Sequence, residues 1–387
     1  MGPQACAGPV AAQLRTLEAP PKWLNLVPIV AQWLWLSIKY RSVTLPSCAN
    51  PAIPAGALVG EGKMEYFASM GAVARRVTAA TTSIVCADVR TMPAIRDAMR
   101  AANLDFPVIA KPGMGWCGFG VRLIQDDAQL SRYLTEFPRG ARIVPQAYLA
   151  DEGEAGIFYL REPSANKGYV LGMLLRQYPQ VRGDGGSTTA RLMARNPRLA
   201  RIGRDGACEA ACDPSRVPSS GERVRLSAVS SSRDGALSLD GNWAITSELT
   251  SAIDAVALDM RGFQVGRFDV KFSDLDALRR GTSLKLIEVN GAGSEAVHAW
   301  GPAHSLAQAD AIIFDKQRRM FELASRMRAL GHRPIGLARL ARLHLSAAGA
   351  HPPLSFVQLS SREVFNFEYG FNTARRERAA NGRDDSI

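Results

Sequence analysis

Two stretches decide the fold: GRFDVKF, residues 266–272, and LKLIEVNGAGSEA, residues 284–296. Each reads as a strand with alternating apolar and polar positions. The connection between them is short and polar, so the two strands are predicted to pair as an antiparallel hairpin. Because the strands are otherwise apolar, their charged residues must face either a binding site or the solvent, and we favour a site.

The charged residues of these two strands form the pattern of a metal site. Residues i and i+2 share a face of a strand, so Asp269 points the same way as Arg267, and Glu288 the same way as Asn290. Pairing of the strands would let Asp269, Glu288 and Asn290 converge as three oxygen donors. Such donors suit one or two Mg²⁺ ions held together with substrate phosphates, with Mn²⁺ as a substitute. The alternative is a solvated strand face without a ligand.

A glycine-rich turn upstream points to a phosphate ligand. The expected strand at 106–111 delivers Lys111 into PGMGWCGFG, and a second strand follows at 121–124. Glycines let backbone N–H groups turn toward a phosphate and approach it closely. The turn matches neither the P-loop nor the dinucleotide fingerprint, because a strand rather than a helix follows it. Glycine-rich hairpin loops also occur without ligands, so the turn alone does not decide the function.

Composition narrows the class of protein. The chain has 387 residues, of which 47% are hydrophobic and 21% charged, which excludes a mostly disordered or collagen-like chain. The sequence has no uninterrupted run of eighteen apolar residues, so we expect no membrane-spanning helix. The net charge of +11 suits an anionic partner, but no nucleic-acid-binding motif accompanies it, so we expect no nucleic-acid partner. Six scattered cysteines and the lack of a secretory pattern predict a cytoplasmic protein.

The stretch at residues 21–40 is rich in tryptophan and has basic flanks. It contains three of the six tryptophans, and Lys22, Lys39 and Arg41 border it. Pro28 and the short apolar length argue against a spanning helix. Two interpretations stay open: a helix packed on the protein's own core, or peripheral contact with lipid at the inner membrane face.

The remaining elements alternate between short strands and helices. Strands are expected at 141–149, 154–160, 168–177 and 222–229, and helices at 126–137, 188–202, 248–261 and 304–330. Pro197 should kink or split the second of these helices.

Taken in order, these segments resemble the ATP-grasp superfamily, and most closely its carboxylate–amine ligase branch, which includes D-alanine–D-alanine ligases and glutathione synthetases. The resemblance rests on FPVIAKPGMGWCGFGV, EAGIFY, RGDGGST, GRFDVKF and LKLIEVNGAGSEA. It implies an α+β ATP-grasp fold in which two α+β lobes grip ATP, with a shortened N-terminal region. The implied division is an N-terminal segment 1–74, a small lobe 75–145, a large lobe 146–335 and a C-terminal extension 336–387 with a disordered end.

The resemblance also implies a set of ATP-binding residues. Lys111 would contact the phosphates, beneath a flexible lid formed by Gly115, Gly118 and Gly120. The adenine-binding edge would be the hinge segment Gln146, Ala147, Tyr148 and Leu149. Glu154 would bind the ribose, and Arg176 would replace a second phosphate-binding lysine. Ala147 stands where relatives often carry an acidic residue, so one adenine contact is missing or made by the backbone.

By the same resemblance, residues 266–272 and 284–296 would supply the catalytic part of the site. Asp269, Glu288 and Asn290 would be the magnesium ligands. Arg267 would be the catalytic arginine that steadies an acylphosphate and a tetrahedral intermediate. Gly293 and Ser294 would hold a substrate carboxylate.

The implied reaction joins a small-molecule carboxylate to an amine at the expense of ATP, through an acylphosphate, with release of ADP and phosphate. Two alternatives stay open: an ATP-grasp kinase without amine transfer, and a non-catalytic nucleotide-binding protein associated with a membrane. The sequence leaves the two substrates and the oligomeric state open.

Overall fold

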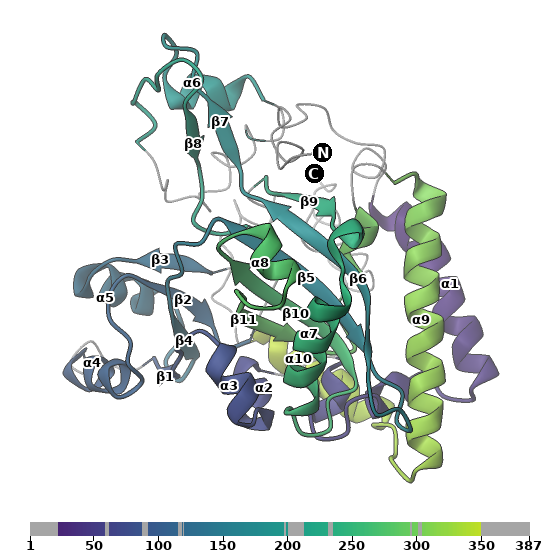
Figure 1. Ribbon diagram of the computed structural model, residues 1–387. Helices are drawn as coiled ribbons and strands as arrows, with labels where there is room; N and C mark the ends of the chain where they lie inside the picture. Colours follow the sequence, from purple (N-terminus) through teal and green to yellow (C-terminus); the bar gives the residue numbers. More distant parts are fainter. Residues whose placement is uncertain are drawn as a thin grey trace, which may run out of the picture.

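The computed structural model consists of two sheet-containing lobes, with a helical edge formed by the ends of the described chain (Figure 1). The structure describes residues 22–58, 62–86, 92–114, 118, 120–196, 199, 213–230, 235–294, 296–300 and 304–349. Strands and helices mix within each lobe, so the predicted α+β class with two lobes is confirmed. The four-part division by residue number remains a prediction, and the end of its C-terminal extension lies outside the described residues.

The small lobe is a four-stranded antiparallel sheet of order β1-β4-β2-β3, with two helices packed against it. Its elements are β1 (Ile84–Val85), α4 (Met92–Ala101), β2 (Val108–Pro112), β3 (Arg122–Ile124), α5 (Asp127–Thr135) and β4 (Arg142–Ala147). Val108 and Ala110 point into the core beneath α4 and α5. The alternation of the strand therefore turns Lys111 to the opposite face, toward the large lobe.

The large lobe is built on a five-stranded antiparallel sheet of order β11-β10-β5-β6-β9. Its strands are β5 (Gly153–Leu160), β6 (Tyr169–Gln177), β9 (Leu237–Asp240), β10 (Val265–Phe272) and β11 (Lys285–Asn290). Ile157 and Phe268 belong to a core shared with α7 (Ser247–Leu258), α2 (Lys63–Ser69) and α3 (Ala72–Val77). The charged residues at alternate positions lie on the other face, where they form the candidate site.

The antiparallel pairing of the two diagnostic strands is confirmed. Arg267 stands opposite Asn290, and Asp269 stands opposite Glu288. The connection between the strands holds a short helix, α8 (Leu275–Arg279), which the sequence analysis did not predict. Its first turn is capped by the side chain of Asp274, which accepts from the backbone N–H of Ala277 at 2.7 Å.

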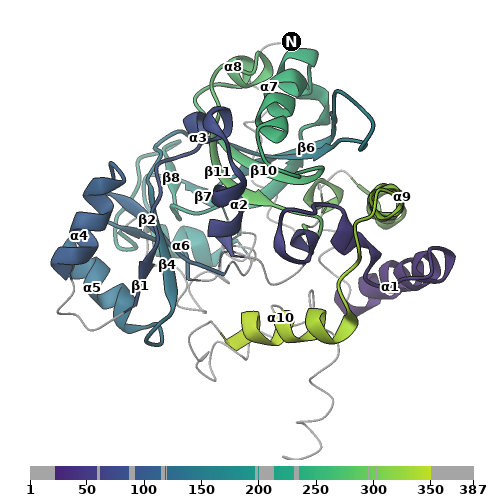
Figure 2. The same cartoon turned by 90° about the horizontal axis from the view of Figure 1, so that it is seen from below.

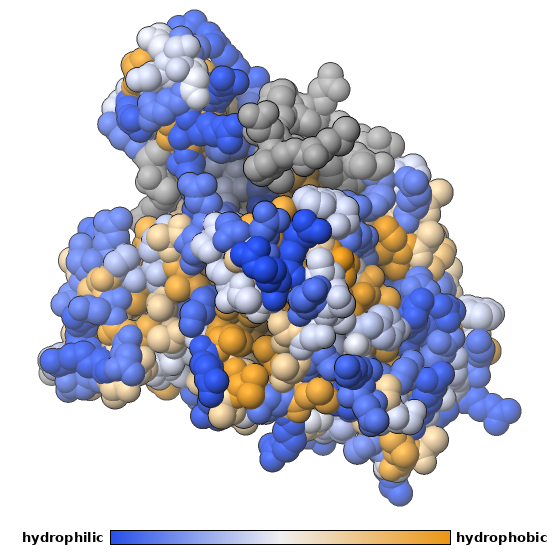
Figure 3. All heavy atoms as spheres, in the orientation of Figure 1, coloured by the Kyte–Doolittle hydropathy of each residue, from blue (hydrophilic) through white to orange (hydrophobic). Residues whose placement is uncertain are grey.

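A small unit projects from the large lobe beside its sheet. It comprises β7 (Gln180–Arg182), α6 (Thr189–Ala194) and β8 (Arg223–Arg225), and its visible face is mostly hydrophilic (Figures 1 and 3). Of the helix predicted over 188–202 with a kink or split at Pro197, the structure shows α6, which ends at Ala194 with Arg195 as its C-cap. Pro197, predicted to break that helix, lies outside the described residues.

The opposite edge is formed by helices from both ends of the chain. Helix α1 (Lys22–Lys39) lies beside α9 (Leu306–Ala329), and α10 (Leu337–Gly349) lies on the side of the molecule away from α7 and α8 (Figures 1 and 2). The 3-10 turns η2 (Leu45–Cys48) and η3 (Pro54–Ala57) lead from α1 toward the core of the large lobe. Across the described ranges, no helix combines the length and hydropathy needed to cross a membrane.

Asn50 fixes the loop between η2 and η3 to the start of β10. Its buried amide group donates to the carbonyls of Gly56 (3.1 Å) and Val265 (2.9 Å). Its Oδ1 accepts from the backbone N–H groups of Gln264 (2.8 Å) and Val265 (3.1 Å). One side chain thus satisfies four backbone groups, three of them at the start of the strand that carries the site.

We therefore expect Asn50→Ala to lower the free energy of unfolding by about 2–4 kcal/mol, because several buried backbone groups lose their partners at once. Urea denaturation of the variant and of a control, Gln125→Ala at an exposed position, measures this cost. Equal midpoints for the two variants would show that Asn50 does not hold the strand in place.

Candidate functional site

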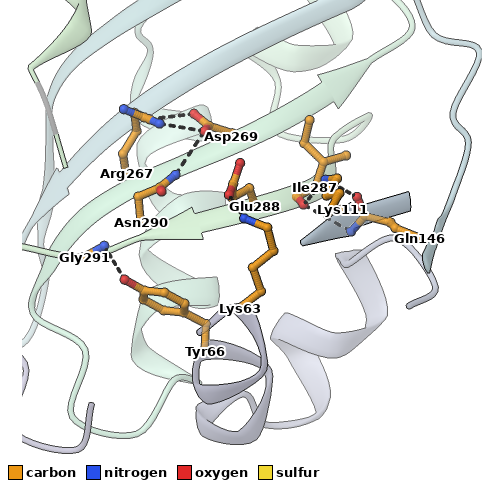
Figure 4. A network of polar contacts seen from close by, with 10 residues as sticks. All are labelled: Lys63, Tyr66, Lys111, Gln146, Arg267, Asp269, Ile287, Glu288, Asn290 and Gly291. Carbon is orange, nitrogen blue, oxygen red and sulfur yellow. Dashed lines mark hydrogen bonds and ion pairs between the residues drawn. The ribbon is translucent and has the colours of Figure 1, made fainter. Parts of the chain in front are cut away.

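An aspartate at the centre of the sheet face is held from two sides. Both oxygens of Asp269 accept from Arg267, Oδ1 from Nε at 2.7 Å and Oδ2 from Nη2 at 2.9 Å (Figure 4). Asn290 donates from Nδ2 to Oδ2 of the same carboxylate at 3.1 Å. The hairpin thus brings together Asp269, Asn290 and Arg267 as the sequence predicted.

The arginine–aspartate pair depends on a glycine in the neighbouring strand. Gly156 on β5 stands opposite Asp269. A Cβ atom at this position would lie 2.9 Å from Oδ1 of Asp269 and 3.2 Å from Cδ of Arg267. Asp269 is only 4% exposed, so it has little room to give way. The missing side chain therefore leaves the space in which the ion pair forms.

Glu288 is the more accessible of the two carboxylates. Its side chain is 31% exposed, against 5% for Asp269. Its Oε1 accepts from Nζ of Lys63 at 2.5 Å (Figure 4). Burial alone would raise the pKa of Glu288, but the positive charges of Lys63, Lys111 and Arg267 outweigh it and lower that pKa to about 2.

Lys63 is a site residue that the sequence analysis missed. It opens α2, and its backbone N–H donates to the carbonyl of Gly113 at 3.0 Å, where the glycine-rich turn begins. The available signal was the stretch GEGK, a turn that delivers a lysine to the start of an apolar helix. The pairing of Lys63 with Glu288 spans 225 positions, which no local pattern shows.

Lys111 joins the two lobes. Its Nζ donates to Oε1 of Gln146 at 2.7 Å and to the carbonyl of Ile287 at 3.3 Å, and Gln146 donates from Nε2 to the same carbonyl at 3.1 Å. Desolvation lowers the pKa of Lys111, while the charge of Glu288 opposes that shift. Two acceptors use two of the three N–H donors of the ammonium group.

The shared carbonyl is exposed by an irregularity in the sheet. Between β10 and β11 the register passes from Asp269–Glu288 to Val270–Leu286, so Ile287 has no opposite residue. Such a bulge removes a backbone group from the ladder and redirects it. Here the redirected carbonyl meets the two side chains of the small lobe. A pocket lies at this junction, with Lys63, Lys111, Gln146 and Glu288 among its lining residues.

The predicted adenine edge lies where the chain passes from one lobe to the other. Ala147 ends β4 and donates its N–H to the carbonyl of Ala80 at 2.9 Å, and Tyr148 donates to the carbonyl of Pro107 at 3.4 Å. Leu149 follows before β5 and is half-buried. The position between the lobes agrees with the expectation, while adenine binding by these residues remains a prediction.

Glu154 and Arg176 bind each other rather than facing the pocket beside Glu288. Arg176 Nε lies 3.3 Å from Glu154 Oε1, which also accepts from the hydroxyl of Ser230. Oε2 of Glu154 accepts from the hydroxyl of Tyr178 at 2.5 Å. Both carboxylate oxygens are therefore engaged, and burial raises the pKa of Tyr178. Lys271 borders this cluster, and burial lowers its pKa to about 8.

The predicted substrate loop follows β11 and is held tightly. Gly293 donates its N–H to the carbonyl of Ala57 at 2.8 Å, and a Cβ there would lie 2.1 Å from the carbonyl oxygen of Leu58. The hydroxyl of Ser294 donates to the carbonyl of Gly291 at 2.7 Å. Lys316 on α9 donates to the carbonyl of Ser294. A glycine at 293 is thus required by close backbone approach.

The glycine lid is described only in part. Gly118 and Gly120 have positive φ angles of 79° and 71°, a conformation that favours glycine. The hydroxyl of Tyr133 donates to the carbonyl of Gly120 at 2.6 Å and fixes the end of the turn. Gly115, the third predicted lid residue, lies outside the described residues.

The residues present fit a magnesium ion. Asp269, Glu288 and Asn290 offer hard oxygen donors from adjacent positions of two paired strands. Asp269 forms an ion pair with Arg267, and Glu288 forms one with Lys63, so the surroundings of each carboxylate favour a positive charge. A cation at Glu288 would take over the place of Lys63, while Asp269 would have to share its oxygens with Arg267.

The ion pair at Glu288 has a definite dependence on pH. A carboxyl group whose pKa is about 2 in the folded state stabilises the fold fully above its ordinary value near 4.5, and this stabilisation is lost as the pH falls toward 2. We expect the difference in unfolding free energy between the wild type and Glu288→Gln to shrink steadily over that interval. Urea titrations at a series of pH values measure it, and a difference independent of pH would contradict the assigned pairing.

Comparison with known proteins gave matches in three-dimensional structure only. No protein-family model matches the chain, and no curated protein matches it in sequence. A bifunctional glutathione synthetase from Pasteurella multocida is 18% identical, with a TM-score of 0.33, over 65% of this chain and 36% of that protein. VanG D-Ala:D-Ser ligase from Enterococcus faecalis is 12% identical, with a TM-score of 0.37, over 69% of this chain and 62% of that protein.

D-alanine–D-alanine ligase from Bacillus anthracis is 13% identical, with a TM-score of 0.39, over 73% of this chain and 72% of that protein. The chain therefore spans about a third of the glutathione synthetase and less than two thirds of VanG. Glutathione synthetase and D-alanine–D-alanine ligase are also the enzymes that the sequence motifs resemble. None of these similarities assigns a substrate or a residue role to this chain.

Proposed function

We propose that the protein is an ATP- and Mg²⁺-dependent ligase of the ATP-grasp type, which joins a carboxylate to an amine and releases ADP and phosphate. The observation that supports this most is the grouping of basic and acidic side chains where the lobes meet. Lys63, Lys111 and Arg267 carry three positive charges against the two negative charges of Asp269 and Glu288. An excess of positive charge beside hard oxygen donors suits a ligand that brings both phosphates and a metal.

The lysines would hold the phosphates of ATP. Among the described residues, Lys111 Nζ donates to Gln146 and Ile287, and its third N–H would be directed to a phosphate oxygen. Lys63 would exchange Glu288 for a phosphate oxygen when Glu288 binds the metal. Magnesium, when bound by Asp269, Glu288 and Asn290, would neutralise charge on the phosphate oxygens. The fixed cations act through position and charge, which phosphoryl transfer chiefly requires.

The proposed reaction has two steps. An oxygen of the substrate carboxylate attacks the γ-phosphorus of ATP, the bond to ADP breaks, and an acylphosphate forms. The amine nitrogen then attacks the acyl carbon, phosphate leaves, and the nitrogen loses a proton as the amide forms. Arg267 would stabilise negative charge in both steps, because its guanidinium lies on the same sheet face as the metal ligands.

The adenine and ribose of ATP would lie on one side of this centre, and the carboxylate of the acid substrate on the other. The edge at Gln146, Ala147, Tyr148 and Leu149 would receive adenine, with Ala147 contributing only backbone contacts. Glu154 would bind the ribose after releasing Tyr178 or Ser230, with Arg176 keeping its charge balanced. Gly118 and Gly120, together with Gly115, would close over the phosphates. Gly293 and Ser294 would hold the substrate carboxylate beyond Asn290.

Glu288→Gln should abolish ligase turnover without unfolding the protein, because a neutral amide replaces the accessible metal ligand. We expect a loss of about a thousandfold or more in ADP release. The matched control is Lys285→Gln, an exposed change on the same strand. The assay is phosphate release over a panel of carboxylates, each with and without an amine, and circular dichroism verifies the fold.

Activity retained in Glu288→Gln would overturn the metal assignment. ADP release that needs a carboxylate but no amine would replace the ligase with a kinase. AMP in place of ADP would exclude the acylphosphate route altogether. Nucleotide binding without turnover across the whole panel would leave a binding protein.

Lys63→Met should weaken the interaction with ATP, because it removes a cation from the phosphate site. We expect the KM for ATP to rise about tenfold or more, and Lys63→Arg to recover part of the loss. Lys167→Met, at an exposed position, is the control. An unchanged KM for ATP in Lys63→Met would limit Lys63 to a structural partner of Glu288.

A further inference from the structure

Helix α1 turns an apolar face toward the solvent. Its exposed large side chains are Val27, Val30, Leu34, Trp35 and Ile38, which we call the outer stripe. Val27, Val30, Leu34 and Ile38 are three or four residues apart and so lie along one side of the helix, with Trp35 next to Leu34. Trp35 is 56% exposed and Ile38 is 79% exposed. A helix on the surface of a globular protein normally presents the opposite polarity.

Gln32 and Ser37, two polar residues of α1, are half-buried. Gln32 donates from Nε2 to the carbonyl of Phe314 on α9 at 3.1 Å, and Ser37 donates to the carbonyl of Trp33 at 2.7 Å. The ring of Trp33 meets that of Phe321 edge-on at 5.0 Å, and Leu36 is fully buried. The inner side of the helix is therefore fixed to α9, and in the described structure the outer stripe lies on the opposite, exposed side.

The charged residues in the part of the chain that carries the outer stripe are all basic. The chain has no Asp or Glu between Glu18 and Glu61. Lys39 and the exposed Arg41 stand at the C-terminal end of the stripe. The ammonium group of Lys39 lies 5.3 Å from the ring centroid of Trp35. Tryptophan and basic residues beside an aliphatic face form the combination that stabilises a helix at a lipid headgroup layer.

We propose that the outer stripe binds the surface of an anionic lipid bilayer, with α1 lying parallel to it. A parallel orientation follows because α1 lacks the length and hydropathy to cross a membrane. Anionic headgroups would pair with Lys39 and Arg41. A second copy of the chain fits less well, because its own stripe would bring the same cations and no carboxylate.

The test is co-sedimentation of the full chain with phosphatidylcholine vesicles, with and without one quarter phosphatidylglycerol. The wild type should bind the anionic vesicles more tightly, and added salt should weaken that binding. Leu34→Gln combined with Ile38→Gln should lower vesicle affinity roughly tenfold or more. Leu258→Gln, an exposed apolar change on α7, is the matched control and should bind as the wild type does.

Lys39→Gln combined with Arg41→Gln should reduce binding to the anionic vesicles and leave binding to phosphatidylcholine unchanged. Failure of the wild type to sediment with anionic vesicles at low salt would overturn the proposal. Equal binding by the Leu34→Gln/Ile38→Gln variant would do the same. A wild-type dimer that dissociates in this variant, without vesicle binding, would assign the outer stripe to a second copy. ATP turnover measured in parallel keeps this outcome separate from the proposed ligase function.

Discussion

The arrangement of the candidate site depends on the register between β10 and β11. Asp269 stands opposite Glu288, and Arg267 stands opposite Asn290. Because side chains alternate between the two faces of a strand, a slip of one residue would turn one set of these groups into the core beneath α7. The apolar residues on the other face, such as Phe268, make that slip costly. Burial on one face thus fixes the chemistry on the other.

The bulge at Ile287 adds a second consequence of that register. A regular ladder would have kept its carbonyl within the sheet, whereas the skipped pairing makes it the acceptor for Lys111 and Gln146. The small lobe is therefore tied to the large lobe one residue before Glu288. One irregularity thus positions both Lys111 and Glu288, the residues proposed to bind phosphate and metal.

The sequence predicted what local patterns can carry. Alternation along two apolar strands was enough to predict the hairpin and the residues that face each other across it. The sequence analysis missed Lys63, because its contact with Glu288 joins residues distant in the chain. It also missed the hydrogen bonds that Tyr178 and Ser230 donate to Glu154. Helix α6 ends at Ala194, before the predicted break at Pro197, since a helical pattern does not show where tertiary contacts end. The five-residue α8 is too short to show a period at all.

The two interpretations of the tryptophan-rich segment concern different sides of one helix. The inner side, with Leu36 against Phe321, satisfies the interpretation of a helix packed on the protein's own core. That packing leaves the apolar outer stripe on the solvent side of the helix. On the inner side, Ile29 also packs against an apolar cluster that contains Ala296 and Ala299, shortly after Ser294, and Ile313 of α9. A bilayer bound to the outer stripe would therefore lie across α1 from this apolar cluster.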